Sequence, residues 1–255
     1  MPAKRVNLVG APLDPVTLAD CLAAVDRAVT EREPTVHTAV NAAKVVRIQR
    51  DPRLARALWD ADLSTADGQP VVWASRLLGQ PVPERVAGID LMEHLLAHAA
   101  LRGYRVFLLG ARDDVVEDAA DAITRRHVGI DICGYRHGYF APEDDEDVAR
   151  EVTAATPDLL FVALETPRKE LFLAEQRHQL RVPFAMGVGG AFDVLAGRRR
   201  RAPRWASRLG LEWLFRLAQD PRRLARRYAA GNVRFIMLVL RELVRRRLPW
   251  ATVRS

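Results

Sequence analysis

An aspartate, an asparagine and an arginine occupy positions in this sequence where side chains could do chemistry. Asp67 follows a short, mainly apolar run and precedes Gly68, and Asn41 ends an earlier apolar run. In open α/β sheets, ligands bind beyond the carboxyl ends of the strands, so both side chains are placed to meet a substrate. Arg85 adds a cation in the segment that follows. Asp67 could act as a base, or its carboxylate could simply cap the next helix.

Two glycine turns follow predicted strands. Gly110 closes the first turn, and Gly187, Gly189 and Gly190 belong to the second. Glycine lets a phosphate or ribose approach the backbone, and a helix N-terminus favours anions, so two such turns indicate a nucleotide-sized ligand. Neither turn matches the G-x-G-x-x-G dinucleotide fingerprint, so we do not expect NAD binding.

The sequence predicts no metal ion and no other cofactor. The D-x-D pattern occurs at residues 60–62 and 145–147, but the first lies at a predicted helix end and the second in an acidic first helical turn. No histidine pairs with a cysteine or carboxylate at ligand spacing. The two cysteines, Cys21 and Cys133, fit neither a disulfide framework nor a metal site.

Apolar strand runs alternate with helical patterns through the first 195 residues. We expect strands at residues 35–40, 105–109, 130–133, 158–164 and 182–187, and helices at 17–32, from 51 and at 113–127. Helices between strands predict parallel strands joined by right-handed crossovers. The predicted fold is therefore α/β, with a Rossmann-like, mostly parallel sheet and helices on both faces, in a catalytic domain of residues 1–195.

Residues 196–255 differ from this body in charge. They hold 17 arginines, no lysine and three acidic residues, a net charge of +14, whereas the first 195 residues have a net charge of −7. Such a basic helical appendage seeks nucleic acid, anionic lipid or diphosphate, or it covers the body with a solvated arginine face. Arg216, Arg223 and Arg226 share one helical face, unless Pro221 restarts the helix.

The appendage continues with a segment typical of an interfacial helix. Phe235, Leu238, Val239, Glu242 and Arg245 mix apolar and charged faces. No apolar run approaches the roughly 20 residues of a spanning helix, and the N-terminus lacks the apolar core of a signal peptide. We therefore expect a cytoplasmic protein.

Nine segments, taken in order over roughly residues 5 to 235, resemble the WecG/TagA/CpsF family of glycosyltransferases. These segments are Ala66–Gly68, Glu84–Leu91, Phe107–Gly110, Gly138–Phe140, Pro167–Glu170, Gly187–Asp193, Arg201–Pro203, Leu211–Leu217 and Pro221–Leu224. The resemblance implies an inverting, metal-independent transfer of a sugar from a UDP-sugar to a polyprenyl-diphosphate-linked acceptor sugar. It also implies a role in surface polysaccharide or cell-wall polymer synthesis.

The resemblance also implies roles for residues. Asp67 occupies the position of the family's base, and Arg85 and the glycine turns are candidates to bind the diphosphate. Tyr139 could stack on the uracil, or it could be a core aromatic residue. The basic C-terminal segment serves the membrane-bound substrate in the family, which gives Arg216, Arg223 and Arg226 the lipid diphosphate or the anionic leaflet to bind. The protein would then attach peripherally to the inner face of the cell membrane.

Two positions depart from the family pattern in segments associated with sugar recognition. The usual Thr-x-Asn reads Ala39-Val40-Asn41 here, with a threonine one place earlier at Thr38. The usual Pro-Lys-Gln-Glu reads Pro167-Arg168-Lys169-Glu170, so Lys169 replaces the glutamine. We therefore expect these residues to bind a sugar other than N-acetylmannosamine, such as a uronic acid. Two other functions stay open, a non-catalytic scaffold of the same pathway and a nucleic-acid-binding protein. A homo-oligomer also stays possible.

Overall fold

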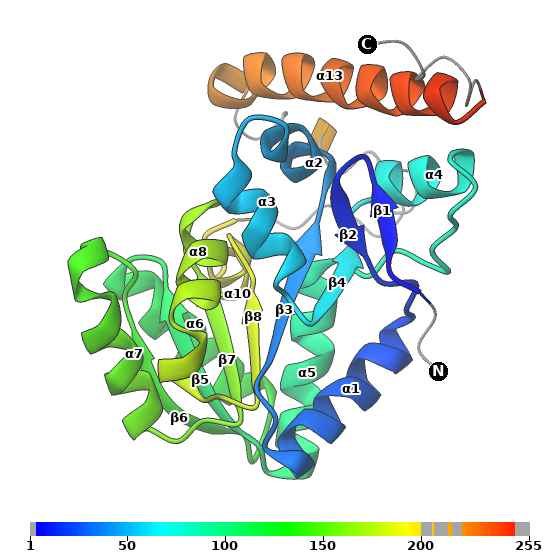
Figure 1. Cartoon of the computed structure of the whole chain (residues 1–255). Coiled ribbons are helices and arrows are strands. Elements are labelled where there is room, and N and C mark those ends of the chain that lie inside the picture. Colours follow the sequence, from blue (N-terminus) through cyan, green and yellow to red (C-terminus); the bar gives the residue numbers. More distant parts are fainter. Residues whose placement is uncertain (1–3, 200–205, 207–213, 216–220, 248–255) are drawn as a thin grey trace.

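The computed structural model describes residues 4–199, 206, 214–215 and 221–247, and for residues 221–230 only the backbone. These residues form a six-stranded sheet, a separate two-stranded hairpin, covering helices and a long C-terminal helix (Figure 1).

The central sheet is parallel throughout, in the strand order β4-β3-β8-β7-β5-β6. Its strands are β3 (Thr35–Val40), β4 (Leu63–Ala66), β5 (Arg105–Gly110), β6 (Asp131–Arg136), β7 (Leu159–Ala163) and β8 (Phe184–Gly187). The predicted α/β fold and its parallel sheet are confirmed. The strand predicted at residues 130–133 begins one residue later and runs three residues further.

Helices cover both faces of the sheet, because successive side chains of each buried strand point to opposite sides. In β7, Phe161 packs with α1 (Leu18–Glu31), α5 (Gly88–Arg102), α6 (Asp113–Arg126) and α10 (Ala191–Leu195). Its neighbour Leu160 packs with α7 (Asp145–Ala154), α8 (Arg168–Glu175) and α9 (Arg177–Leu180) on the other face. A short 3-10 helix, Pro142–Asp144, precedes α7.

The helix starts follow from local chemistry. Thr17 forms a capping box with Asp20 at the start of α1. Asp51 accepts the Leu54 amide at the start of the predicted helix α3 (Pro52–Trp59), with Pro52 in the first turn.

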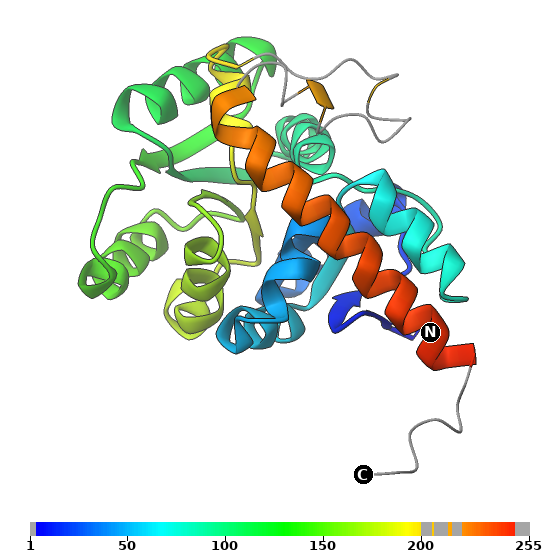
Figure 2. The ribbon, with the colours of Figure 1, turned by 90° about the horizontal axis from the view of Figure 1, so that it is seen from above.

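A third apolar cluster holds the hairpin and the C-terminal helix against the body. It joins β1 (Val6–Leu8) and β2 (Ala11–Leu13) to α2 (Ala42–Ile48), α3, α4 (Gln69–Leu77) and α13 (Pro221–Arg247). The helix α13 lies across α2 (Figure 2). Its described residues begin at Pro221, and residues 216–220 lie outside the described ranges. The domain boundary at residue 195 stays a prediction.

The face of α13 predicted to be interfacial turns instead toward the body. Phe235 and Val239 are buried in the hairpin cluster, and Leu238 and Glu242 are half-buried. The exposed apolar side chains lie elsewhere on the same helix, at Val233, Ile236, Met237, Leu240 and Val244. Within the described ranges, no helix has the length and apolar character needed to cross a membrane.

Candidate active site

The predicted site residues gather at the carboxyl edge of the sheet because its parallel strands end almost in line. Val40 pairs with Ala66 at the ends of β3 and β4, and Val162 pairs with Gly187 in β7 and β8. The Asp67 amide donates to the Val40 carbonyl at 2.8 Å. Asp67 and Asn41 directly follow β4 and β3, and Gly187 is the last residue of the next strand, β8, as expected for a ligand site in an open α/β sheet.

Asp67 is half-buried, and its carboxylate does not cap the next helix. The N-cap of α4 is Gly68, with no side-chain cap hydrogen bond, so the capping alternative is wrong. Among the described residues, no hydrogen-bond donor reaches the Asp67 carboxylate. A carboxylate that no structural hydrogen bond occupies is available to accept a proton from a ligand.

Arg85 lies in the segment that runs beside the end of β4. The next residue, Val86, donates its amide to the Ala66 carbonyl at 3.0 Å. The Arg85 guanidinium is mostly buried and pairs with Asp90 at 2.6 Å. The structure therefore places a fixed cation near the strand end that carries Asp67.

Asn41 has a clear structural duty. Its side-chain oxygen accepts the Lys44 amide at 3.0 Å and caps α2. The Lys44 ammonium then turns back under the strand end and donates to the Ala39 carbonyl at 2.6 Å and to the Thr38 hydroxyl at 3.2 Å. Thr38 is therefore a buried partner of a lysine.

Lys44 completes its contacts on Glu170 of α8, at 2.8 Å. The same Glu170 oxygen lies 3.0 Å from the Lys169 ammonium, which also donates to the Thr166 hydroxyl. Sequence reasoning missed Lys44, because a lone lysine early in a helix is typical of a solvated face. Its placement one turn after the capping Asn41 was the only available signal.

The two lysines set the pKa of Glu170. Burial alone would raise the pKa of this carboxyl group, but Lys44 and Lys169 lower it to about 2. Burial and the nearby Lys44 lower the pKa of Lys169 to about 8, although Glu170 and Asp67 act in the opposite direction. Asp67 therefore lies within electrostatic reach of Lys169, and the four side chains form one charge-balanced group.

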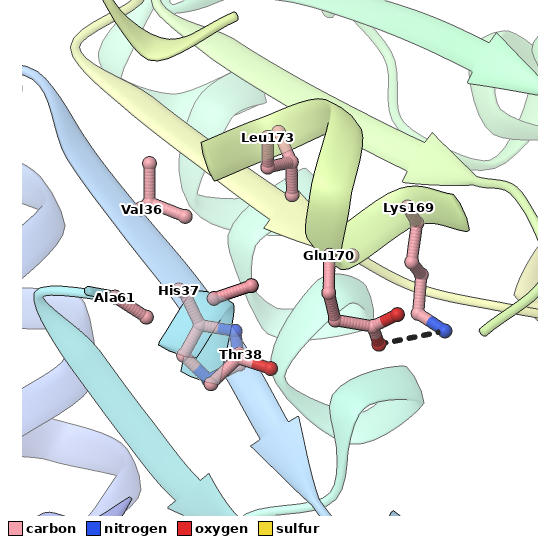
Figure 3. A pocket seen from close by; sticks show the side chains of 9 residues that line it. Val36, His37, Thr38, Ala61, Lys169, Glu170 and Leu173 are labelled. Carbon is pink, nitrogen blue, oxygen red and sulfur yellow. Dashed lines mark ion pairs between the residues drawn. The ribbon is translucent and has the colours of Figure 1, made fainter. Parts of the chain in front are cut away.

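A small cavity of about 10 Å³, enough for roughly one water molecule, lies between β3 and α8. His37, Thr38, Lys169 and Glu170 are among its lining residues (Figure 3). The buried Nδ1 of His37 and the buried Oε2 of Glu170 have no hydrogen-bond partner among the described residues.

The second glycine turn is open in part. A side chain at Gly187 would lie 3.0 Å from Cδ of Lys169, so the glycine makes room for that lysine rather than for a ligand. At Gly189, where φ is +56°, no described atom lies within 4 Å of an added Cβ. Among the described atoms, the one that Gly190 would meet is an oxygen of the Asp193 carboxylate, at 3.8 Å. No described side chain therefore covers the Gly189–Gly190 backbone, which leaves room there for a ligand.

Gly110 serves packing within the sheet. Its φ is +126°, and an added Cβ would lie 2.6 Å from the Ala163 carbonyl of β7. The loop that contains Gly138 also packs against this turn, because the Gly138 amide donates to the Ala111 carbonyl at 2.8 Å. Tyr139, next in this loop, is 74% exposed, so its interpretation as a core aromatic residue is wrong.

The acidic patterns are used in ion pairs. Asp62 accepts the Val36 amide and pairs with Arg177, and Asp145 pairs with Arg168. Over the described part of the chain, no three His, Cys, Asp or Glu side chains form a group that could hold a metal ion. Both cysteines are free thiols.

The three arginines predicted to bind the lipid diphosphate have side chains outside the described residues. Arg216 lies outside the described residues. Arg223 and Arg226 belong to the helical backbone of α13, and their side chains also lie outside the description.

The edge thus offers a half-buried carboxylate, fixed cations, an open glycine turn and an exposed aromatic ring. A carboxylate beside cations can take a proton from a hydroxyl while the cations meet the charge of a leaving phosphate.

Comparison with known proteins agrees with this chemistry. Residues 6–249 match the profile of the family described as "Glycosyl transferase WecG/TagA/CpsF family". Two relatives share the name N-acetylglucosaminyldiphosphoundecaprenol N-acetyl-beta-D-mannosaminyltransferase. The relative from Bacillus spizizenii strain W23 is 40% identical over 177 residues, which span 69% of this chain and 68% of the relative. The relative from Bacillus subtilis strain 168 is 38% identical over 176 residues, or 69% and 67% of the two chains.

Proposed function

The chain belongs to the WecG/TagA/CpsF family of glycosyl transferases, and we propose that it transfers a sugar from a UDP-sugar to a polyprenyl-diphosphate-linked acceptor sugar. The product would enter a surface polysaccharide or cell-wall polymer. The carboxylate of Asp67 carries this proposal, because it lies at the carboxyl edge of the sheet without a structural hydrogen bond among the described residues.

The proposed reaction is a single displacement with inversion. The acceptor hydroxyl oxygen attacks the anomeric carbon, and Asp67 takes the hydroxyl proton. The new C–O bond forms as the bond from the anomeric carbon to the UDP oxygen breaks, and UDP leaves with that electron pair. A positioned base of this kind contributes about 10²- to 10⁴-fold to the rate.

Cations and backbone amides must meet the charge that develops on the UDP diphosphate. Arg85 beside β4 and the open Gly189–Gly190 backbone are suited to this role. The exposed Tyr139 ring beside the Gly110 loop is suited to stack on uracil. Gly110 itself supports the site by letting β5 pack against β7.

The donor sugar is proposed from the relatives. Both are named as N-acetylmannosaminyltransferases acting on N-acetylglucosaminyldiphosphoundecaprenol, which supports these two sugars. A uronic acid donor keeps one specific observation in its favour. The Lys169 ammonium donates to Thr166 and Glu170, which leaves one N–H without a partner among the described residues. Lys169, Glu170, Thr38 and Asn41 are the proposed sugar-binding group.

We also propose that the protein works at the inner face of the cell membrane without spanning it. The exposed apolar side chains of α13 recur every three or four residues, which is typical of a helix that lies in an interface. Arg216, Arg223 and Arg226 would bind the lipid diphosphate or the anionic leaflet. A homo-oligomer fits this proposal but no observation favours it.

The first test is UDP release from a panel of UDP-sugars with a polyprenyl-diphosphate-N-acetylglucosamine acceptor. Asp67→Asn should lower kcat by about 10²- to 10⁴-fold with little change in KM or in the urea unfolding midpoint. Unchanged kcat would place the base elsewhere. Wild-type protein that releases no UDP with any donor would favour a non-catalytic scaffold. If that inactive protein also bound nucleic acid in a salt-sensitive way, the hypothesis of a nucleic-acid-binding protein would be favoured.

A further inference from the structure

A second site candidate lies away from the sheet edge, on the hairpin side of α13. It is a groove of about 500 Å³, a volume typical of small-ligand sites. Asn7, Gly10 and Gln49 line one wall, and Leu238, Arg241 and Arg245 are among the residues of the other. None of the proposed catalytic or sugar-binding residues lines this groove.

The hairpin wall presents carbonyl groups that already have partners. Gln49 donates to the Val9 carbonyl and Trp59 to the Gly10 carbonyl, both at 2.9 Å. Arg246 donates to the Asn7 carbonyl at 3.2 Å. These carbonyl oxygens are therefore already hydrogen-bonded without Arg241 and Arg245, the other two arginines of the groove.

The helix wall carries more positive charge than its partners balance. Arg246 uses all three guanidinium nitrogens, on Glu242, Leu78 and Asn7. Arg245 directs two nitrogens to Glu242, and Arg241 has no hydrogen-bond or ion-pair partner among the described residues. Three arginines against one glutamate leave a net charge of +2.

The position of the groove on α13 indicates what kind of anion it would meet. Arg234, Arg241 and Arg245, spaced by seven and four residues, form one strip along the exposed side of the helix. The exposed Ile236, Leu240 and Val244 form an adjacent apolar strip. An amphiphile with an anionic head and an apolar tail matches both strips at once.

We propose that this groove binds the phosphate of an anionic phospholipid headgroup, with Arg241 as the main ligand and Arg245 as its neighbour. Guanidinium groups bind phosphate through paired hydrogen bonds, and basic residues on an interfacial helix are attracted to anionic leaflets. The inference rests on the proposed membrane attachment and gives it a defined headgroup site that is separate from the catalytic edge.

The test is co-sedimentation of the full chain with phosphatidylcholine vesicles, with and without phosphatidylglycerol, at fixed ionic strength. The double variant Arg241→Gln/Arg245→Gln should bind the phosphatidylglycerol vesicles about 30-fold more weakly than wild type, since each basic residue at an anionic surface contributes roughly 5-fold. Glycerol phosphate should compete with wild type and not with the double variant. If glycerol phosphate fails to compete with wild type while the double variant still binds vesicles more weakly, the groove binds phosphate only when the phosphate belongs to a membrane lipid.

The matched control is Arg125→Gln/Arg126→Gln, which removes the same charge from an exposed turn of α6. Its vesicle binding should stay within about 2-fold of wild type. An equal loss in the control pair, or no loss in the groove pair, would overturn the proposal. Transfer to a detergent-dispersed acceptor should be unchanged in the groove pair, so a failure of the transferase proposal would appear there and leave the vesicle result intact.

Discussion

A single carboxylate oxygen of Glu170 pairs with both buried lysines beneath the candidate site. This oxygen, Oε1, accepts hydrogen bonds from Lys44, Lys169 and Thr166. The charged side chains of Lys44, Lys169 and Glu170 are all buried. Removing one partner of a buried ion pair leaves an uncompensated charge. Glu170→Gln should therefore lower the free energy of unfolding at pH 7 by about 3–5 kcal/mol, as measured by urea denaturation. A variant as stable as wild type would show that water reaches the two lysines.

The pH dependence of this loss follows from the pKa of Glu170, which is about 2 in the folded protein and 4.5 for an ordinary glutamate side chain. The native state therefore binds fewer protons than the unfolded state between these values. The stabilisation is complete above pH 4.5 and is lost as the pH falls toward 2, and it amounts to about 3 kcal/mol. The stability gap between wild type and Glu170→Gln should narrow over that window. A gap that stays constant would contradict the assignment.

One ring nitrogen of the buried His37 has no partner among the described residues, which leads us to expect an ordered water molecule beside it. The Thr65 hydroxyl donates to the Val86 carbonyl, so His37 Nε2 must donate to Thr65 and Nδ1 is left as an acceptor. Burial, with a smaller contribution from Lys44, lowers the pKa of His37 to about 3, which keeps the ring neutral. Glu170 Oε2 is a second acceptor beside the same one-water cavity. A high-resolution crystal structure should show one water molecule that donates hydrogen bonds to both His37 Nδ1 and Glu170 Oε2. A cavity without electron density for a water molecule would refute this prediction.

The sequence could identify some of these residues and not others, for a physical reason. Asp67 was predictable because a strand, a carboxylate and a glycine are adjacent in the chain. Lys44, Glu170 and His37 come from α2, α8 and β3, and their contact depends on strand order, which no local pattern encodes. Gly187 was predicted as a phosphate approach, whereas its free space holds the Lys169 side chain.

At the scale of elements, Gly110 fixes how closely β5 and β7 end together. Gly110→Ala would place a methyl group 2.6 Å from the Ala163 carbonyl at a φ of +126°, so it should cost roughly 2–4 kcal/mol in thermal or urea unfolding. Gly103→Ala is the matched control, because φ is +71° there and no described atom lies within 4 Å. That substitution should cost about 1 kcal/mol. Equal losses would mean that backbone conformation, and not the contact with β7, decides the effect.

Element boundaries were predictable wherever local signals agreed. The run of apolar and β-branched residues at 35–40 is strand β3 itself, and the Asp51-Pro52 start of α3 is confirmed. The β1–β2 hairpin carried no comparable signal, because each strand has three residues and is stabilised by packing on α2, α3 and α13. The direction of α13 was misjudged for a related reason. A helix with apolar residues on two sides does not reveal in sequence which side meets the body.

At the scale of the whole molecule, the basic helix α13 packs against an element of the candidate active site. The helix α13 packs on α2, whose first turn holds Asn41 and Lys44. Arg246 adds hydrogen bonds to Leu78 at the end of α4 and to Asn7 in the hairpin. Loss of the α13 contacts would therefore loosen α2, the helix that positions the buried Lys44.

Phe235→Ala tests this connection, because its buried ring joins α13 to the hairpin cluster. Losing a buried phenylalanine costs about 3–5 kcal/mol, so amide hydrogen exchange in residues 231–247 and in α2 should rise. The rate of UDP release should fall as α2 loosens around Lys44. Ile236→Ala, next along the helix but 55% exposed, should leave both readouts near the wild-type values. Faster exchange in α13 with protection unchanged in α2 would show that the helix docks without supporting the catalytic edge.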